Sequence, residues 1–195
     1  MQDLQTQKAG LRRQIRSRLE SLEAAGAKSL AVHERLFSTA WWREARWVFV
    51  YVAMPGEVDT APIVLRAYQD GKLVAVPRME GEEVVFYRYE GRTRELVPNQ
   101  FGILEPDPLW IPVDPLLLAE GPLLVLTPGL AFDRRLRRMG RGKGYYDRFL
   151  ARARRGPQVC LAVGLAFAEQ LVEEVPVGPL DASLDGLITD GELLG

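Results

Sequence analysis

The chain has 195 residues, of which 47% are hydrophobic and 26% are charged, and its formal net charge at pH 7 is −1. These values are ordinary for a soluble globular protein, and they exclude a protein that attracts nucleic acid through its net charge. A chain of this length can bury a real core, so we expect one domain over residues 1–195.

The single cysteine, Cys160, excludes an intrachain disulfide and is interpreted as core filler. The only histidine, His33, is interpreted as structural, which excludes Ser-His-Asp or Cys-His catalysis and metal sites built from several histidines. The N-terminus is polar, which predicts no signal peptide, and no apolar run approaches the ~20 residues of a membrane span. We therefore expect a cytoplasmic protein with no membrane partner, and we take it to be a monomer.

Apolar residues recur at steps of three, four and seven between residues 3 and 24, which predicts an amphipathic helix. The apolar stripe consists of Leu4, Leu11, Ile15, Leu19 and Leu22. Lys8, Arg12 and Arg16 are four residues apart, so they line one face of this helix and repel one another. That face is either simply solvated or binds a polyanion that relieves the repulsion.

A second helix is predicted at about residues 27–40, followed by a strand at Trp47–Ala53. The sequence of this strand, WVFVYVA, is apolar on both faces, as in the buried strand of a parallel sheet. Pro55-Gly56 ends the strand.

Thr60 is expected to cap a helix that runs to about Asp70. Glu57 and Asp59 therefore follow the carboxyl end of a strand, which is where α/β folds bind their ligands. Glu57 is either such a ligand contact or an exposed loop acid.

The rest of the chain alternates predicted strands and helices. Strands are predicted at Leu73–Pro77, Val84–Tyr89, Leu123–Leu126, Val159–Gly164 and Gly186–Thr189, and helices at Tyr145–Arg155 and near Phe167–Val172. The strand at 84–89 alternates in polarity and is expected to be antiparallel, and the proline-rich residues 99–122 are expected to form an ordered surface loop with a short helical turn. The pattern predicts a three-layer α/β/α sandwich with a mainly parallel central sheet, Rossmann-like in arrangement.

The stretch Thr127–Leu150 combines glycines and cations between a predicted strand and a predicted helix. Its sequence, TPGLAFDRRLRRMGRGKGYYDRFL, is neither a Walker A loop nor a GxGxxG dinucleotide motif. Glycines and cations alternate within it at Gly140, Arg141, Gly142, Lys143 and Gly144. Alternating glycines let successive backbone N–H groups turn toward an anion at a helix start, and the cations neutralise its charge. We predict that this basic glycine segment binds nucleotide phosphates.

Asp147 lies in the first turn of the helix predicted after this segment. It is either an acid favoured there by the helix dipole or a ligand of Mg²⁺, which uses one or two carboxylates besides phosphate oxygens. A second carboxylate would come from the loop before the last strand, where Asp181 and Asp185 are the candidates. The alternative for both is a role as a turn or cap residue.

A basic glycine loop can also bind a nucleic-acid backbone, with Tyr145 and Tyr146 stacking on bases. The rest of the chain is net acidic and contains no recognised RNA or DNA module, so we expect no nucleic-acid partner.

The stretch Thr127–Leu150 resembles the signature of the 5-formyltetrahydrofolate cyclo-ligase family, whose members are also called methenyltetrahydrofolate synthetases. The resemblance covers most of the chain through the motifs KAGLR (Lys8–Arg12), MPGEVDT (Met54–Thr60), FGILEP (Phe101–Pro106) and VPVGPLD (Val175–Asp181). It implies the conversion of 5-formyltetrahydrofolate and ATP, in the presence of Mg²⁺, to 5,10-methenyltetrahydrofolate, ADP and phosphate.

The resemblance also implies a set of site residues. ATP would be bound by Lys8, Arg12, Arg138, Met139, Gly140, Arg141, Gly142, Lys143, Gly144, Tyr145 and Tyr146. Folate would be bound by Val52, Glu57, Gly140, Arg141, Gly142, Lys143 and Gly144. Mg²⁺ would be held by Asp147 and Asp181, and the catalytic residues would be Arg141, Lys143 and Tyr145.

In the reaction that the resemblance implies, the formyl oxygen attacks the γ-phosphorus of ATP, N10 then closes the ring, and phosphate leaves. Phosphoryl transfer depends mainly on positioning and on charge neutralisation, so it suits a chain with almost no histidine. The alternative hypothesis is a non-catalytic protein that binds folate or nucleotide on the same scaffold, because one fold hosts many functions.

Overall fold

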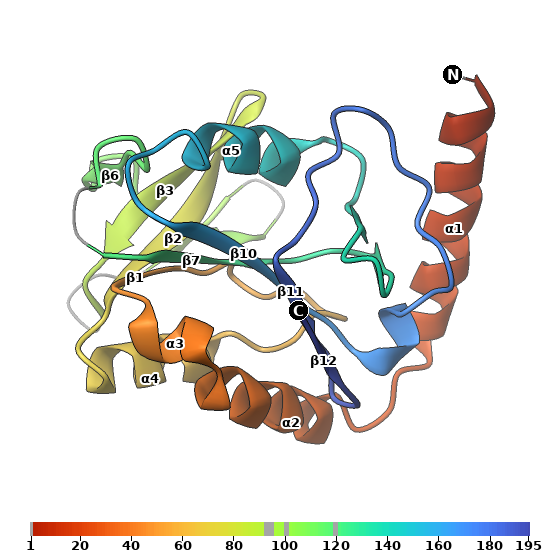
Figure 1. Ribbon diagram of the computed structural model, residues 1–195, viewed down its shortest axis with the longest axis horizontal. Helices are drawn as coiled ribbons and strands as arrows, with labels where there is room; N and C mark the ends of the chain where they lie inside the picture. Colours follow the sequence, from red (N-terminus) through yellow and green to blue (C-terminus); the bar gives the residue numbers. More distant parts are fainter. Residues whose placement is uncertain (1, 92–95, 100–101, 119–120) are drawn as a thin grey trace.

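The computed structural model describes residues 2–91, 96–99, 102–118 and 121–195, so Phe101 of the FGILEP motif lies outside the described residues. Within them, the central sheet has the strand order β12-β11-β10-β7-β1-β2-β3-β6 (Figure 1). Its strands are β1 (Trp47–Phe49), β2 (Leu73–Glu80), β3 (Glu83–Tyr89), β6 (Pro112–Val113), β7 (Leu123–Thr127), β10 (Cys160–Leu165), β11 (Gly186–Ile188) and β12 (Leu193–Leu194).

The middle of the sheet is parallel, because β2, β1, β7, β10 and β11 all run in one direction. The pairs β2–β3, β3–β6 and β11–β12 at the two edges are antiparallel. The predicted mainly parallel sheet is confirmed, and so is the antiparallel strand expected at residues 84–89.

Helices cover both faces of this sheet (Figure 1). On one face lie α2 (Ala25–Ser38), α3 (Ala40–Glu44) and α4 (Ala61–Gln69), and on the other lies α5 (Tyr145–Ala153). Because both faces are covered, the central strands are mostly apolar, and all five residues of β7 are buried. The predicted three-layer α/β/α arrangement is confirmed.

Several boundaries differ from the expectations. The first helix, α1 (Gln2–Glu20), ends earlier than residue 24, and α3 was not expected at all. Within residues 99–122 the described part contains β5 (Leu104–Glu105), which pairs with β4 (Val97–Pro98), and the edge strand β6. These strands are two residues long, so their sequences carry no period that could predict them.

Thr60 occupies the position before α4 as predicted, but its side chain makes no capping hydrogen bond. Its hydroxyl donates instead to the carbonyl oxygen of Tyr51 at 2.7 Å, and the carboxylate of Asp59 accepts from the N–H of Ala61 at 3.0 Å. The capping role predicted for Thr60 is therefore wrong, and Asp59 satisfies the helix start.

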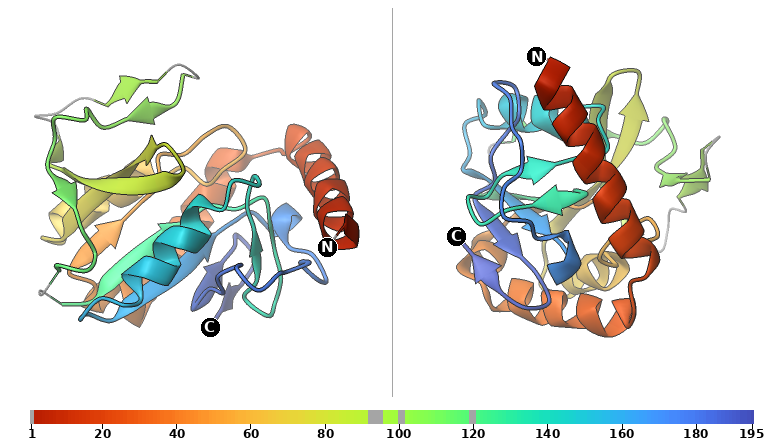
Figure 2. Two further views of the ribbon diagram at one scale, coloured as in Figure 1. Left: turned by 90° about the horizontal axis from the view of Figure 1, so that it is seen from above. Right: turned by 90° about the vertical axis from the view of Figure 1, so that its right-hand side faces the viewer.

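Helix α1 packs beyond the carboxyl ends of the parallel strands, against the hairpin of β8 (Ala131–Phe132) and β9 (Arg138–Met139) (Figure 2). Ile15 on its apolar stripe is fully buried in a small second core with Ala131, Met139 and Val175. This packing sets the cationic face of α1 beside the basic glycine segment.

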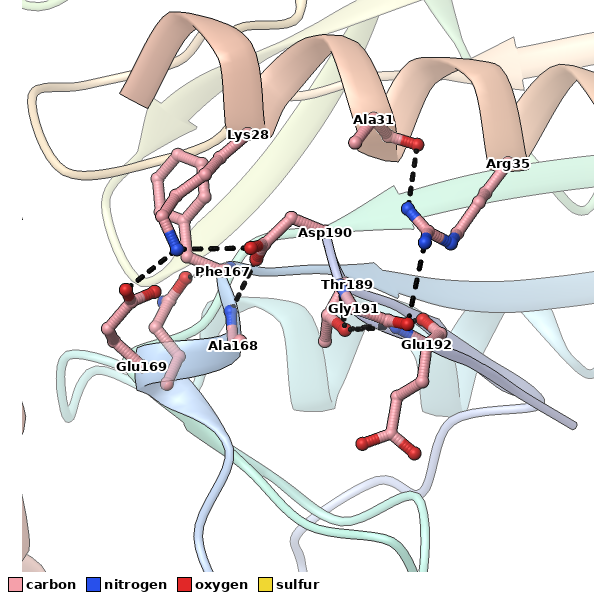
Figure 3. Close-up of polar contacts among 11 residues, drawn as sticks. Lys28, Ala31, Arg35, Phe167, Ala168, Glu169, Thr189, Asp190, Gly191 and Glu192 are labelled. Carbon is pink, nitrogen blue, oxygen red and sulfur yellow. Dashed lines mark hydrogen bonds and ion pairs between the residues drawn. The ribbon is translucent and has the colours of Figure 1, made fainter. Parts of the chain in front are cut away.

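A polar network fastens the C-terminal strands to α2 (Figure 3). The ammonium of Lys28 lies 2.7 Å from Glu169, in the 3₁₀ turn η2 (Ala168–Gln170), and 3.0 Å from Asp190, which follows β11. Asp190 also accepts the N–H of Ala168 at 2.7 Å, so the turn, the helix and the last hairpin hold one another in place. The helix expected near residues 167–172 is thus a short 3₁₀ turn.

Candidate active site

A cavity of about 250 Å³ opens beyond the carboxyl ends of β1 and β7. These strands are neighbours, yet the chain leaves β1 toward β2 on one side and leaves β7 toward β10 on the other. Such a reversal of strand order creates a crevice in which doubly wound folds bind ligands. Tyr51 and Val52 line the cavity from the β1 side, and Pro128 and Gly129 line it from the β7 side.

The basic glycine segment forms another wall of the cavity. Gly142 and Gly144 have φ values of +111° and +68°, a left-handed conformation that side chains rarely adopt, so glycine is required for the path of the chain. Gly144 is also the residue before α5, whose first N–H groups therefore face the segment. This backbone path at a helix start is compatible with the predicted phosphate binding, which stays a prediction.

Arg138 and Asp147 form the most buried ion pair of this wall. Their side chains are 3% and 19% exposed, and the guanidinium Nη2 lies 2.7 Å from Asp147 Oδ1. Arg138 also donates to the carbonyl oxygen of Pro128 at 3.2 Å, and Asp147 Oδ1 accepts the N–H of Ala182 at 3.2 Å. Asp147 therefore lies directly beside the loop that carries Asp181.

The cationic face of α1 reaches this loop and the glycine segment. The ammonium of Lys8 lies 2.5 Å from Asp181 Oδ2, which also accepts the N–H of Gly178 at 2.6 Å. The guanidinium of Arg12 donates to the carbonyl oxygen of Gly140 at 3.1 Å and sits beside Gly142. The structure thus brings Lys8, Arg12, Asp147 and Asp181 to one side of the glycine segment.

Asp185, the other candidate for the second carboxylate, is held elsewhere. Its Oδ2 accepts from Arg154 and from the N–H of Ala162 in β10, both at 2.8 Å. Neither Asp185 nor Asp181 lines the cavity itself. Among the two candidates, Asp181 is the one placed next to Asp147.

Glu57 lies on the opposite wall, after β1. Its Oε2 accepts the N–H of Met54 at 3.1 Å, and its Oε1 lies 3.1 Å from the guanidinium of Arg141. Glu57 is 11% exposed in its side chain, whereas Arg141 is 45% exposed. The pair spans the cavity between the loop after β1 and the glycine segment.

Lys143 and the two tyrosines complete the lining contributed by the segment. Lys143 is exposed, and its side chain has no acidic partner within the described part of the chain. Tyr145 is half-buried and donates its hydroxyl to the carbonyl oxygen of Gly81 at 3.2 Å. Tyr146 is buried, and both burial and the charge of Glu57 raise the pKa of its hydroxyl, against the smaller effect of Arg138.

Four predicted ATP-binding residues do not line the cavity, namely Lys8, Arg12, Gly142 and Met139, and Met139 points elsewhere. Its side chain is 2% exposed and packs in the small core under α1, and it does not line the cavity. His33 and Cys160 also lie away from the cavity, as expected. His33 Nε2 lies 2.6 Å from the carbonyl oxygen of Asp59, and burial raises the pKa of the Cys160 thiol to about 11.

An apolar wall was missed by the sequence reasoning. Pro77 and Met79 reach the cavity from β2, and Ile103, Leu104 and Glu105 reach it from β5 and the residue before it. The FGILEP motif was the only available signal, because these residues belong to two short segments that meet only in the folded chain.

A parallel sheet with a basic glycine segment, convergent carboxylates and an apolar wall at its switch point defines an α/β enzyme that acts on an organic substrate together with an anionic one. The model of the 5-formyltetrahydrofolate cyclo-ligase family matches residues 4–190. The chain belongs to this family, and the predicted resemblance is confirmed.

Individual relatives agree with this assignment. A probable 5-formyltetrahydrofolate cyclo-ligase from Caenorhabditis elegans is 33% identical over 184 residues, which are 89% of this chain and 87% of that protein. The solved structure of 5,10-methenyltetrahydrofolate synthetase from Aquifex aeolicus is 30% identical, has a TM-score of 0.77, and covers 96% of this chain and 91% of that one. The synthetase structure from Mycoplasma pneumoniae, at 21% identity and a TM-score of 0.71, shares the fold; it covers 94% of this chain and 98% of that one. The family is therefore named both for the substrate and for the product of one ring closure.

Proposed function

We propose that this protein converts 5-formyltetrahydrofolate and ATP to 5,10-methenyltetrahydrofolate, ADP and phosphate with the help of Mg²⁺. The observation that carries the proposal is that residues of the basic glycine segment, Glu57 and Asp147 line one cavity, while the loop that carries Asp181 is bonded to Asp147. Membership of the cyclo-ligase family supports the same reaction.

The charges divide the site into two sides. Lys8, Arg12 and the backbone of the glycine segment offer cations and N–H groups to the phosphates of ATP. Val52 and the apolar wall offer a largely apolar surface, and Glu57 offers an acceptor, for the folate head. The segment itself lies between the two sides, so its cations reach the atoms that react.

The two aspartates fit a magnesium ion. Asp147 uses Oδ1 and Asp181 uses Oδ2 for contacts within the described chain, which leaves Oδ2 of Asp147 and Oδ1 of Asp181 without a partner there. No group of three or more metal-binding side chains occurs among the described residues, and Mg²⁺ needs only one or two carboxylates beside phosphate oxygens and water. When bound, the ion would supply neutralisation of the phosphate charge.

In the proposed chemistry the formyl oxygen forms a bond to the γ-phosphorus while the bond to the β-phosphate oxygen breaks. N10 then bonds to the formyl carbon, loses its proton, and phosphate leaves with the former formyl oxygen. Lys143 and Arg141 neutralise the charge on the transferred phosphoryl group. Tyr145, whose hydroxyl donates to the carbonyl oxygen of Gly81, lines the cavity beside the reacting formyl group. These steps need no histidine, in agreement with the structural role of His33.

The test is absorbance at the band of the methenyl product after mixing the protein with 5-formyltetrahydrofolate, ATP and Mg²⁺. We expect product only when all three are present, and a large loss of rate in Lys143→Ala with folate affinity retained. Tight folate binding without product would instead support the non-catalytic alternative.

The remaining expectations concern the state of the protein. We infer one cyclo-ligase domain over residues 1–195, a monomer in the cytoplasm, and no nucleic-acid partner. Most cations between Arg134 and Arg155 are paired with acids within the described chain, which argues against a phosphate-backbone surface. No helix among the described residues is long and apolar enough to cross a membrane.

A further inference from the structure

The hydroxyl of Tyr146 is a buried polar group that lacks a hydrogen-bond partner within the described residues. Tyr146 is 7% exposed and lines the cavity. Buried hydroxyls in native proteins almost always have a partner, because leaving one unsatisfied costs the full penalty of desolvation.

Two contacts pack the ring of Tyr146 and so fix the position of its hydroxyl oxygen. Phe86 packs edge-on against the ring at 6.3 Å between centroids, and the guanidinium of Arg138 lies 5.6 Å from the ring centroid. Arg138 is itself fixed by Asp147. The position of the hydroxyl is therefore built into the fold.

The other tyrosines of the cavity show that this is specific to Tyr146. Tyr51 is also buried and lines the same cavity, but its hydroxyl donates to the carbonyl oxygen of Val58 at 3.1 Å. Tyr145 donates to Gly81 at 3.2 Å. Among the three tyrosine hydroxyls of the cavity, only that of Tyr146 has no acceptor within the described part of the chain, so it can donate to a ligand.

The surroundings of this hydroxyl select the kind of ligand atom. A tyrosine hydroxyl is protonated at neutral pH, so the buried hydroxyl of Tyr146 acts as a neutral hydrogen-bond donor. Tyr146 shares its cavity with Glu57 and the apolar wall, whereas Lys8 and Arg12 do not line it, so the surroundings suit a neutral carbonyl oxygen of the organic substrate better than a phosphate oxygen. Glu57 is also the acceptor that the proposed function assigns to the folate head.

We propose that the hydroxyl of Tyr146 donates a hydrogen bond to a carbonyl oxygen on the head of the bound folate, beside the N–H groups that Glu57 accepts. This inference rests on the proposed function and moves the side chain of Tyr146 from the nucleotide to the folate side of the site. Two carbonyl oxygens have the required chemistry, the oxo group of the pteridine ring and the formyl oxygen.

The experiment compares the wild type with Tyr146→Phe, which removes only the hydroxyl and keeps the packed ring. Calorimetric titration with 5-formyltetrahydrofolate, without ATP so that no turnover occurs, should show affinity lower by about three- to tenfold in the variant. Affinity for a non-hydrolysable ATP analogue should not change. The melting temperature should stay the same or rise, because an unsatisfied buried hydroxyl is lost.

Tyr51→Phe is the matched control for stability. It makes the same deletion where the hydroxyl already has a protein acceptor, so its melting temperature should fall. A fall of similar size in Tyr146→Phe would mean that its hydroxyl has a protein partner, and it would overturn the proposal.

Titration with 5-methyltetrahydrofolate, which keeps the ring oxo group but lacks the formyl oxygen, separates the two acceptors. A loss of affinity with both ligands assigns the ring oxygen, and a loss with the formyl compound alone assigns the formyl oxygen. Equal affinity of variant and wild type for both ligands, or a loss for the ATP analogue instead, refutes the role of Tyr146 while leaving the proposed function intact. If the wild type bound neither folate, the proposed function itself would fail, and this inference with it.

Discussion

Lys8 and Asp181 are joined by an ion pair of 2.5 Å although 173 positions separate them in the chain. Their side chains are 12% and 21% exposed, so the pair is partly shielded from solvent. It links a cation proposed for phosphate with a carboxylate proposed for magnesium, and it fixes α1 to the loop before β11. The amphipathic helix is therefore part of the candidate site as well as of the scaffold.

Replacing Lys8 by alanine should weaken the use of ATP more than the use of folate. We expect the KM for ATP to rise roughly tenfold, equivalent to about 1.4 kcal/mol, and the KM for 5-formyltetrahydrofolate to change little. Steady-state kinetics with each substrate varied in turn measures both values. Arg13→Ala is the matched control, since Arg13 is an exposed cation of the same helix. An equal rise in the KM for ATP in this variant would show that Lys8 acts only through the overall positive charge of the helix.

Replacing Asp147 or Asp181 by asparagine should raise the Mg²⁺ concentration needed for half-maximal activity by at least about tenfold, because the ion loses a charged ligand. Asp185→Asn should leave this concentration unchanged, since Asp185 is engaged by Arg154 and Ala162. Activity is measured over a magnesium titration. Unchanged metal dependence in Asp147→Asn would restore the interpretation of this residue as a helix-start acid.

Asp147→Asn should also lower stability, because it leaves the buried guanidinium of Arg138 without its counter-charge. The free energy of unfolding should fall by about 2 kcal/mol, less than for a fully buried pair since Asp147 retains some exposure. The asparagine oxygen can still accept the N–H of Ala182, so the variant should fold. Urea unfolding gives the value, and Asp181→Asn should show a smaller loss.

Arg141→Ala should lower kcat by about two orders of magnitude while changing stability by less than about 1 kcal/mol. Its guanidinium is 45% exposed and pairs with Glu57, so the pair contributes little to the fold, whereas a cation at the reacting group contributes mainly to the transition state. A loss confined to KM would show that Arg141 only binds substrate. Arg152→Ala serves as the control, because the side chain of Arg152 is 48% exposed and pairs with Asp114 outside the lining of the cavity.

The Lys28–Asp190 contact should make stability depend on acid pH (Figure 3). Burial alone would raise the pKa of Asp190, but the Ala168 N–H and the Lys28 ammonium outweigh burial and lower it. Because the pKa is lower in the folded chain, the stabilisation is complete above the unfolded value of about 3.9 and is lost as the pH falls through the folded value.

Asp190→Asn should therefore lose about 1 kcal/mol relative to the wild type at pH 7, and the difference should shrink as the pH falls below the unfolded pKa of about 3.9. Urea unfolding at several pH values measures it. Glu192→Gln, at an ion pair whose arginine is 66% exposed, should show little effect at any pH. If Asp190→Asn were still less stable than the wild type at the lowest pH, its lower stability would not come from the lost charge.

Local pattern alone was enough for the central elements. The apolar runs of β7 and β10 predicted buried parallel strands, and the stripe that contains Ile15 predicted α1, because burial on both faces or on one face imposes its own sequence period. The glycines at 142 and 144 predicted an unusual backbone, and their positive φ values confirm it. The family signature named the reaction.

Tertiary structure decided which of these residues meet. Residue type and position left both Asp181 and Asp185 open, and only the family resemblance implied Asp181. In the folded chain, the Ala182 N–H bonded to Asp147 brings the loop of Asp181 beside the glycine segment, whereas Asp185 is held by Ala162. The apolar wall with Met79 and the unpartnered hydroxyl of Tyr146 also arise only where distant segments pack. The hydrophobic period of a helix or strand can be detected in a short stretch of sequence. The partners of a polar side chain depend instead on the path of the whole chain.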